Sequence, residues 1–174
     1  SSLFLGKAVH EVLEWLYHQI KNREVEIDDV IDYFSEKWQN YMGELNGSVR
    51  FGNSDETESF NKGVKFLVNY YTSNKPFNSN VIAIERKIIF PLDEKGNYKI
   101  QGFVDRLDYD EEEGIYEIHD YKTNAYPKTQ AEIDRDRQLA FYHLGLKETF
   151  GKDIKVKLVW HFLAHNKRMV SKRT

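Results

Sequence analysis

The sequence predicts an α+β fold formed by a single domain that covers residues 1–174. Apolar residues recur at helical spacing through the first half of the chain, whereas the second half is mixed and contains runs of β-branched and aromatic residues. No internal repeat, low-complexity tract or linker divides the chain. With 40% hydrophobic and 14% aromatic residues, the composition lies well above that of disordered proteins and provides material for a core.

Three helices are expected in the first half, because apolar side chains recur three or four positions apart. They are placed near residues 3–21, 30–41 and 60–71. Asp28 is a candidate N-cap of the second helix, and Gly43 followed by Asn46-Gly47 is its expected end. The third helix is expected to end in the polar stretch that leads to Pro76.

The second half is expected to contain three strands, one helix and a last strand, in that order. The strands are placed at residues 81–90, 98–108, 115–122 and 154–163, and the helix at about 128–150. Pro91 stops the first strand and Gly151 stops the helix. The second and third strands form a hairpin.

This hairpin is expected to bring two carboxylates together. Gly114 should take the positive φ that a loop centred on residues 112–113 needs. The register that follows pairs Tyr109 with Tyr116, Leu107 with Ile118, and Asp105 with Asp120. Directly opposed like charges destabilise a sheet unless something positive lies between them. A divalent cation meets that need, because hard cations take oxygen ligands.

Lys122 should share a face with Asp120, because side chains alternate along a strand. Two carboxylates, a lysine and a cation suit the cleavage of a phosphodiester. The alternative interpretation is structural. In it, Asp105 pairs with Arg106 or Arg86, and Asp120 and Lys122 form an ordinary surface ion pair.

Other polar residues could belong to the same site, although each pattern is common elsewhere. His10 follows Gly6 by one helical turn, and a glycine there would allow another element to approach closely. Glu85 lies on a strand that is otherwise apolar on one side, where it shares a face with Lys87. It could equally be a solvent-facing charge on an edge strand.

Basic and amide side chains near the last predicted helix could bind phosphate. Gln138 and Tyr142 are four residues apart and project together from that helix. Arg135 and Arg137 flank this pair and could hold a phosphate. The basic tail (Lys167, Arg168, Lys172 and Arg173) is a further candidate, although such tails are commonly only solvated.

Five motifs, in this order, resemble the RecB-like branch of the PD-(D/E)xK nuclease superfamily, which includes Cas4-like exonucleases. They are Gly-Lys-Ala-Val-His-Glu at 6–11, Glu85, Gly-Phe-Val-Asp-Arg-Leu-Asp at 102–108, Asp-Tyr-Lys-Thr at 120–123 and Gln-Leu-Ala-Phe-Tyr at 138–142. The resemblance implies a restriction-endonuclease-like α/β/α core, in which helices flank a mixed central sheet. It also implies DNA as the substrate.

The resemblance implies a role for each matching residue. The metal ligands would be His10, Asp105, Asp120 and the backbone carbonyl of Tyr121. Lys122 would be the catalytic lysine, and Glu85 matches a strand acid whose role is less uniform. Gln138 and Tyr142 match the substrate-side motif. One histidine with two carboxylates suits Mg²⁺ or Mn²⁺.

Composition excludes several classes of site and partner. The chain has no cysteine, so it holds no disulfide, no thiolate zinc site and none of the iron–sulfur cluster that some relatives carry. This fits a reducing compartment, and we expect a cytoplasmic protein. No apolar run approaches the length of a membrane span and no signal-peptide pattern opens the chain, so we expect no membrane partner.

The net charge of −3 does not indicate bulk attraction to nucleic acid, so local patches and bound metal must supply it. The chain lacks the phosphate-binding loop of an ATPase. A helicase or another repair or defence protein is a possible partner. A helicase motor would then be a separate protein or a missing domain. Because the chain begins with Ser1 rather than Met, we expect a fragment of a longer protein.

These observations together predict a metal-dependent DNA nuclease in repair, recombination or defence. An exonuclease that acts on DNA ends or single strands is the expected form. Two alternatives stay open: a non-catalytic nucleic-acid-binding or assembly module of the same fold, and a metal-dependent hydrolase of another phosphate ester.

Overall fold

The computed structural model describes residues 2–44, 53–91, 93 and 95–171. Asn46-Gly47 and the tail residues Lys172 and Arg173 lie outside these residues. The chain forms two compact units, each built from several segments. The first unit consists of Ser1–Asn78, Lys122–Tyr126 and Phe162–Lys167, and the second of Ser79–Tyr121, Pro127–His161 and Arg168–Thr174.

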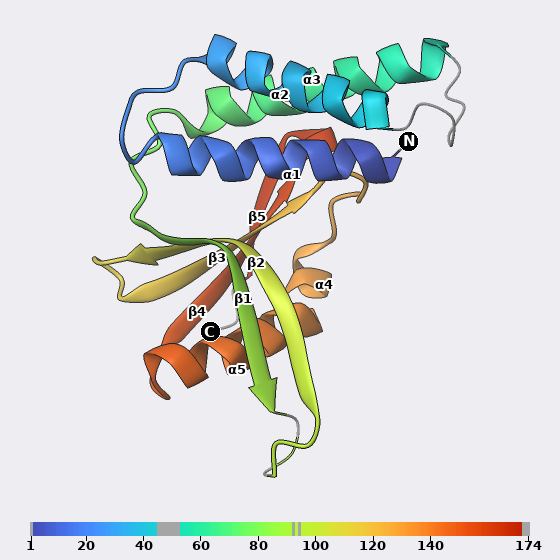
Figure 1. Ribbon diagram of the computed structural model, residues 1–174. Coiled ribbons are helices and arrows are strands. Elements are labelled where there is room, and N and C mark those ends of the chain that lie inside the picture. Colours follow the sequence, from blue (N-terminus) through green and yellow to red (C-terminus); the bar gives the residue numbers. More distant parts are fainter. Residues whose placement is uncertain (1, 45–52, 92, 94, 172–174) are drawn as a thin grey trace. The chain divides into compact units, whose positions relative to one another are not determined.

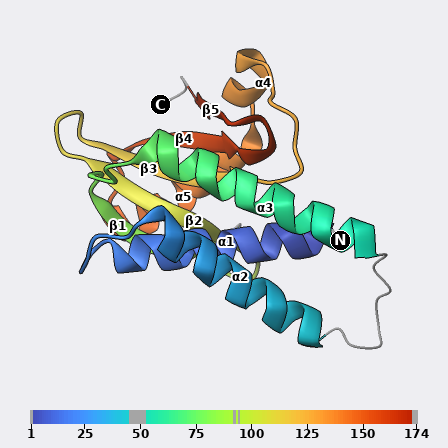
Figure 2. The ribbon, with the colours of Figure 1, turned by 90° about the horizontal axis from the view of Figure 1, so that it is seen from above.

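The first unit is a layer of three helices that pack on one another (Figures 1 and 2). They are α1 (Ser2–Gln19), α2 (Ile27–Glu44) and α3 (Asn53–Asn74). Their apolar stripes are buried as the periodicity predicts, with Val9, Leu16 and Phe34 fully enclosed. A short 3₁₀ helix, η1 (Leu163–His165), packs against α3. None of the described helices combines the length and apolarity that a membrane crossing requires.

The expected N-cap of the second helix is wrong by two residues. α2 begins at Ile27, so Asp28 lies inside its first turn rather than before it. Asp29 Oδ2 instead accepts a hydrogen bond from the Glu26 amide at 3.0 Å, reaching back across the helix start. Acidic residues in a first turn also favour the helix dipole, which explains why a carboxylate at either position looks like a cap in the sequence.

Five strands form one mixed sheet in the order β1-β2-β3-β4-β5. They are β1 (Val81–Pro91), β2 (Lys99–Asp110), β3 (Ile115–Lys122), β4 (Lys155–Phe162) and β5 (Lys167–Val170). The predicted α+β class, with helices flanking a mixed sheet, is therefore confirmed. β5 was not expected, because its four residues are too few to show alternation and two of them are basic.

The β2–β3 hairpin has the predicted register, with Tyr109 opposite Tyr116 and Leu107 opposite Ile118. Gly114 takes a φ of 66°, as its place in the loop requires. Asp110 closes the turn: its Oδ1 accepts from the amides of Glu112 and Glu113 at 3.0 Å each. Its carbonyl accepts from the Gly114 amide at 2.8 Å.

The single helix expected at residues 128–150 is wrong, because the segment forms two helices. These are α4 (Gln130–Asp134) and α5 (Arg137–Phe150). Asp136 takes an extended conformation between them, and its side chain accepts from the Gln138 amide as the N-cap of α5. Gly151 ends α5 as predicted, with a φ of 109°.

Helix α5 packs on the sheet within the second unit and runs behind β1 in Figure 1. Its last residue, Phe150, lies 4.6 Å from the ring of Tyr116, measured between centroids. Tyr116 in turn contacts Tyr109, its partner in the register, at 4.8 Å. The face of β3 that carries Tyr116 is therefore the face that α5 covers, and by alternation Ile118 and Asp120 belong to it.

Two helical glycines in the first unit should respond to alanine in opposite ways. A Cβ on Gly63 of α3 would overlap Phe34 Cζ and lie 2.9 Å from Leu5 Cδ1, whereas a Cβ on Gly43 of α2 would meet nothing within 4 Å. Gly63→Ala should destabilise the fold by roughly 1–3 kcal/mol through overpacking. Gly43→Ala should stabilise it by up to about 1 kcal/mol through helix propensity. Urea unfolding of both variants measures the two changes; equal effects would contradict the packing described here.

Candidate active site

Three carboxylates occupy neighbouring positions on three adjacent strands. On β1 and β2, the pairs Ile84–Arg106 and Arg86–Val104 enclose Glu85 and Asp105, which the same register sets opposite each other. On β2 and β3, the last pair is Arg106–His119, and one step further the register sets Asp105 opposite Asp120. Glu85, Asp105 and Asp120 thus form a row across β1, β2 and β3.

Beyond the last backbone pair of β2 and β3, the side chain of Asp105 hydrogen-bonds to β3. Its Oδ2 accepts a hydrogen bond from the Tyr121 amide at 2.8 Å. This contact directs the carboxylate toward the stretch of β3 in which Tyr121 stands between Asp120 and Lys122.

Asp120 is buried, with 7% of its surface exposed, so it is not part of an ordinary surface ion pair. Its Oδ1 accepts a hydrogen bond from Gln138 Nε2 at 2.8 Å. The same amide group contacts the Tyr142 hydroxyl at 2.8 Å, as the predicted four-residue spacing on the helix allows. Tyr142 then donates to the backbone carbonyl of Phe103 at 3.2 Å. Gln138 and Tyr142 therefore link α5 to both β3 and β2.

The carboxylates of the row affect the pKa of Tyr142. Burial raises the pKa of the Tyr142 hydroxyl to about 12, and the nearby carboxylates of Asp120, Asp105 and Asp136 add to this rise. The hydroxyl therefore keeps its proton at neutral pH, consistent with its role as donor to Phe103.

Glu85 holds an unusual backbone conformation. Its φ is 48°, in the left-handed region, which costs a residue with a Cβ roughly 1–3 kcal/mol. The simple alternation that would set Glu85 and Lys87 on one face is interrupted at this point. Strained positions of this kind cluster at functional sites, and Glu85 is half-buried in the row of acids.

His10 and Lys122 belong to the first compact unit. His10 Nδ1 lies 2.8 Å from the Gly6 carbonyl. Because a carbonyl only accepts, Nδ1 donates a proton to it, which is the orientation that metal-ligating imidazoles adopt when they ligate through Nε2. A Cβ on Gly6 would lie 3.1 Å from Thr123 Oγ1, so Gly6 does allow close approach of another segment, the one that follows Lys122.

Arg135 and Arg137 flank the break between α4 and α5, and both are exposed to solvent. Lys128 forms an ion pair with Asp136 at 2.6 Å, next to both of them. These arginines therefore stand beside the start of α5, where Gln138 is the second residue.

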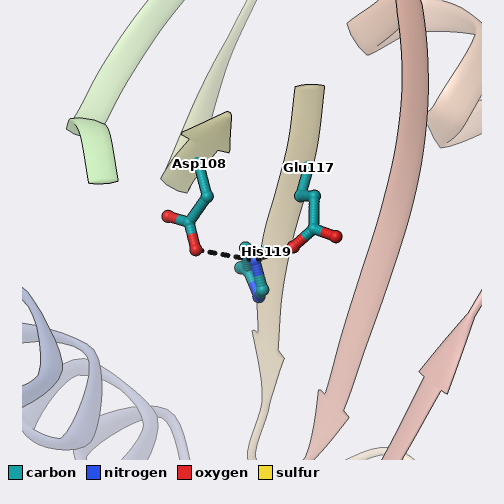
Figure 3. Close-up of side chains that lie close together, drawn as sticks. All are labelled: Asp108, Glu117 and His119. Atoms are coloured by element: carbon teal, nitrogen blue, oxygen red, sulfur yellow. Dashed lines mark ion pairs between the residues drawn. The ribbon is translucent and has the colours of Figure 1, made fainter. Parts of the chain in front are cut away.

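A second cluster of possible ligands lies on the hairpin, and sequence analysis missed it (Figure 3). Ligand atoms of Asp108, Glu117 and His119 all lie within 4.8 Å of one another, so these residues could hold a metal ion. His119 Nε2 lies 3.1 Å from Asp108 Oδ2 and 3.4 Å from Glu117 Oε2. The signal was present in the register, which sets Asp108 opposite Glu117 just as it sets Asp105 opposite Asp120.

Protein cations already balance this second cluster. Arg106 Nε donates to Asp108 Oδ1 at 2.9 Å, and Lys157 Nζ lies 2.5 Å from Glu117 Oε1. The Arg106 side chain is buried together with Asp108 and forms an ion pair with it. The structural alternative had instead paired Arg106 or Arg86 with Asp105. The close approach of Asp108 Oδ2 and His119 Nε2 is electrostatic, because the two atoms are too poorly aligned for a hydrogen bond.

The pKa shifts in this cluster follow from those contacts. Burial alone would raise the pKa of Asp108, but His119 and Arg106 outweigh it and hold the pKa below its ordinary value. His161, whose Nε2 lies 2.9 Å from His119 Nδ1, has its pKa lowered well below the usual range by burial and by neighbouring positive charges. Arg106 and Lys157 contact the other two oxygens, Asp108 Oδ1 and Glu117 Oε1, and already offset much of the negative charge. We therefore interpret the cluster as a structural charge network.

The comparison of the whole chain with protein families decides its relationship. The family model of the PD-(D/E)XK nuclease superfamily matches residues 1–173. The chain belongs to this superfamily. Its members are usually metal-dependent nucleases. A search among curated proteins found no match.

The residues of this superfamily member fit a hard divalent cation at the row of acids. Glu85, Asp105 and Asp120 offer only oxygen atoms, and Asp105 and Asp120 are held by neutral donors, the Tyr121 amide and the Gln138 side chain. Hard divalent cations prefer such oxygen ligands.

Acid should remove the contribution of Glu117 to stability. The contacts with His119 and Lys157 lower the pKa of Glu117 to about 2, from an ordinary value of 4.5. A depressed folded-state pKa stabilises the fold above the unfolded value, and the benefit is lost as pH falls toward the folded value. Between pH 7 and pH 3, the stability advantage of wild type over Glu117→Gln should shrink by roughly 2 kcal/mol at most.

Chemical unfolding of both proteins at the two pH values measures this change. Glu148→Gln, at an exposed position on α5, is the matched control and should differ from wild type equally at both pH values. An advantage of wild type over Glu117→Gln that does not change with pH would contradict the network.

Proposed function

We propose that this chain is a metal-dependent DNA nuclease of the RecB-like, Cas4-like branch of its superfamily. In this proposal it acts as an exonuclease on DNA ends or single strands, in repair, recombination or defence. One observation carries the proposal: the register of β2 and β3, continued one step beyond the pair Arg106–His119, sets Asp105 opposite Asp120. The Tyr121 amide and the Gln138 side chain orient these two carboxylates. Membership of the superfamily supports it.

Asp105, Asp120, His10 and the Tyr121 carbonyl are the residues that would hold Mg²⁺ or Mn²⁺, with Glu85 as a further acid. The bound cation would lower the pKa of a water molecule and offset the charge that develops on the phosphate. Oxygen ligands with one imidazole suit either ion.

The protein's own residues would orient the carboxylates and the substrate. Gln138 restrains one oxygen of Asp120 and the Tyr121 amide restrains one oxygen of Asp105, so neither carboxylate has to reorganise during the reaction. The Lys122 ammonium would donate to phosphoryl oxygens or to the attacking water. Arg135 and Arg137 would contact neighbouring phosphates from the exposed start of α5.

Phe103 supports the choice of single strands or frayed ends. Its side chain is 54% exposed, although it is a large aromatic on a strand of the sheet. It stands two residues before Asp105, a Cα separation of roughly 7 Å along a strand. Tyr142 anchors its carbonyl. An exposed ring at that distance from the carboxylates could stack on an unpaired base.

Loss of a metal ligand should abolish cleavage without loss of the fold. End-labelled single- and double-stranded DNA would be incubated with wild type and Asp120→Asn in Mg²⁺, Mn²⁺ or EDTA. Asp120→Asn keeps the shape of the side chain but lacks the charge, so metal-dependent products should fall below detection. Asp153→Ala, an exposed acid in the turn after α5, is the control and should cleave as wild type does.

A wild-type rate in Asp120→Asn would reject this site. No cleavage by folded wild type with either metal would favour the non-catalytic binding module. Cleavage of another phosphate ester but not of DNA would favour the second alternative. The same gels show polarity, from which end label is shortened first.

Lys122→Ala should lower the cleavage rate by about 10²–10³-fold, the usual effect of removing one group that stabilises transition-state charge. Its affinity for Mn²⁺ in calorimetry should stay close to that of wild type, because the carboxylates are unchanged. Loss of both rate and Mn²⁺ binding would make Lys122 a structural residue.

Phe103→Ala should weaken binding of single-stranded DNA by about 5- to 100-fold, because stacking contributes roughly 1–3 kcal/mol per base. Binding of blunt duplex should change less, since its bases already stack on one another. Ile89→Ala is the matched control, because this β1 side chain is also apolar and 48% exposed. Equal losses with both substrates, or in both variants, would contradict stacking at Phe103.

A further inference from the structure

A cavity of about 390 Å³ lies in the first compact unit, and none of the proposed metal ligands lines it. Four of its lining residues, Ser59, Lys62, Lys65 and Phe66, come from α3. Leu5 of α1 and the pair Thr123-Asn124, which follows β3, complete most of the wall. The cavity therefore brings together three parts of the chain that are distant in sequence.

Its lining residues include two cations and no carboxylate. Lys62 pairs with Glu58 at 2.6 Å, but both side chains are more than half exposed, so a ligand can readily replace this contact. Within the described part of the chain, Lys65 forms no ion pair, and it is exposed at the rim. The cavity is thus positive and suits an anionic group.

The remaining walls suit the other half of an amphipathic ligand. Leu5 and Phe66 are only 5% and 8% exposed and form an apolar floor. Ser59 and Thr123 add hydroxyl groups, and Asn124 adds an exposed amide that can both donate and accept. The apolar floor suits the face of a nucleotide base, and the Asn124 amide suits the polar edge of that base. The two lysines suit the phosphate.

A second cavity in the same unit shows why charge compensation matters. It measures about 300 Å³ and contains Arg23 and Lys75 among its lining residues. Arg23 pairs with Asp29 at 3.0 Å and Lys75 with Glu26 at 3.9 Å, and Glu24 also lines the wall. Size alone does not distinguish the two cavities. The difference is Lys65, which lines the first cavity and forms no ion pair with the described residues, together with the absence of a carboxylate from the residues that line that cavity.

We propose that the cavity between α3 and Thr123 binds a nucleoside phosphate, as the nucleotide next to the scissile phosphate. Thr123 directly follows Lys122, so their Cα atoms are about 3.8 Å apart. The cavity wall therefore begins one residue after the lysine that the nuclease proposal sets against the phosphate. The place of the nucleotide in a strand rests on that proposed function, whereas the binding chemistry of the cavity does not.

Binding measured in EDTA tests the cavity without any cleavage. The probes are thymidine 5′-monophosphate, thymidine, and labelled oligonucleotides that carry a 5′-phosphate, a 3′-phosphate or neither. Lys65→Ala should weaken binding of the monophosphate and of the phosphorylated strand at least fivefold. It should also lower the slope of log affinity against log salt by about one, as loss of one phosphate contact does. Lys65→Arg should restore most of the affinity.

Lys75→Ala, from the compensated cavity of the same unit, is the matched control and should bind within twofold of wild type. Tight binding of the monophosphate alone would identify a free nucleotide as the occupant, and preference for one phosphorylated end would identify a strand terminus. Binding by Lys65→Ala within twofold of wild type, or an equal loss in Lys75→Ala, would overturn the proposal.

The two proposals can fail separately. If Asp120→Asn abolishes cleavage while Lys65→Ala binds normally, the nuclease stands and the nucleotide cavity is wrong. If no metal-dependent cleavage occurs but the monophosphate binds in a Lys65-dependent manner, the cavity stands and the nuclease is wrong.

Discussion

The register of the β2–β3 hairpin is the constraint on which both clusters of charged residues depend. Asp110 and Gly114 close the turn and thereby decide which residues of the two strands meet. Side chains in a sheet repeat with a period of two, so a slip of one residue would move every side chain to the other face. Such a slip would separate Asp105 from Asp120 and Asp108 from Glu117 at once.

The carboxylates on the two faces of this hairpin accept hydrogen bonds from different kinds of donor. On one face, the Gln138 amide and the Tyr121 backbone, both neutral donors, hold Asp120 and Asp105 in place. On the other, Arg106 neutralises Asp108 as a buried ion pair. Neutral donors orient a carboxylate and leave it negative, whereas cations satisfy it. The first arrangement suits a residue that must still bind something, and the second suits a residue whose partner is already present.

Local rules predicted much of this arrangement. The glycine of the loop and the alternation of the strands gave the correct pairing of Tyr109 with Tyr116, and helical spacing joined Gln138 to Tyr142. Three helices and four strands followed from periodicity and from glycine or proline at their ends. These features depend on residues that are near one another in the sequence or that face each other across one tight turn.

Other features depend on contacts that no short pattern records. Asp136 looks like an ordinary residue of a long amphipathic helix, and only its side-chain bond to the Gln138 amide turns it into a helix start. The left-handed conformation of Glu85 and the exposure of Phe103 depend on how neighbouring strands and α5 surround them. Lys157 neutralises Glu117 from a strand 40 residues further along the chain. This ion pair could not be predicted because its two residues are far apart in the sequence.

The break at Asp136 also divides the molecule into parts that can change independently. Because α5 starts afresh there, Gln138 and Tyr142 keep their mutual spacing as members of one rigid helix, whatever the length or composition of the segment before it. Insertions between β3 and Asp136 could therefore change that segment while Gln138 keeps its hydrogen bond to Asp120. The new helix start at Asp136 thus keeps the contacts of α5 with the carboxylates independent of the segment that precedes it, so that segment could vary without loss of those contacts.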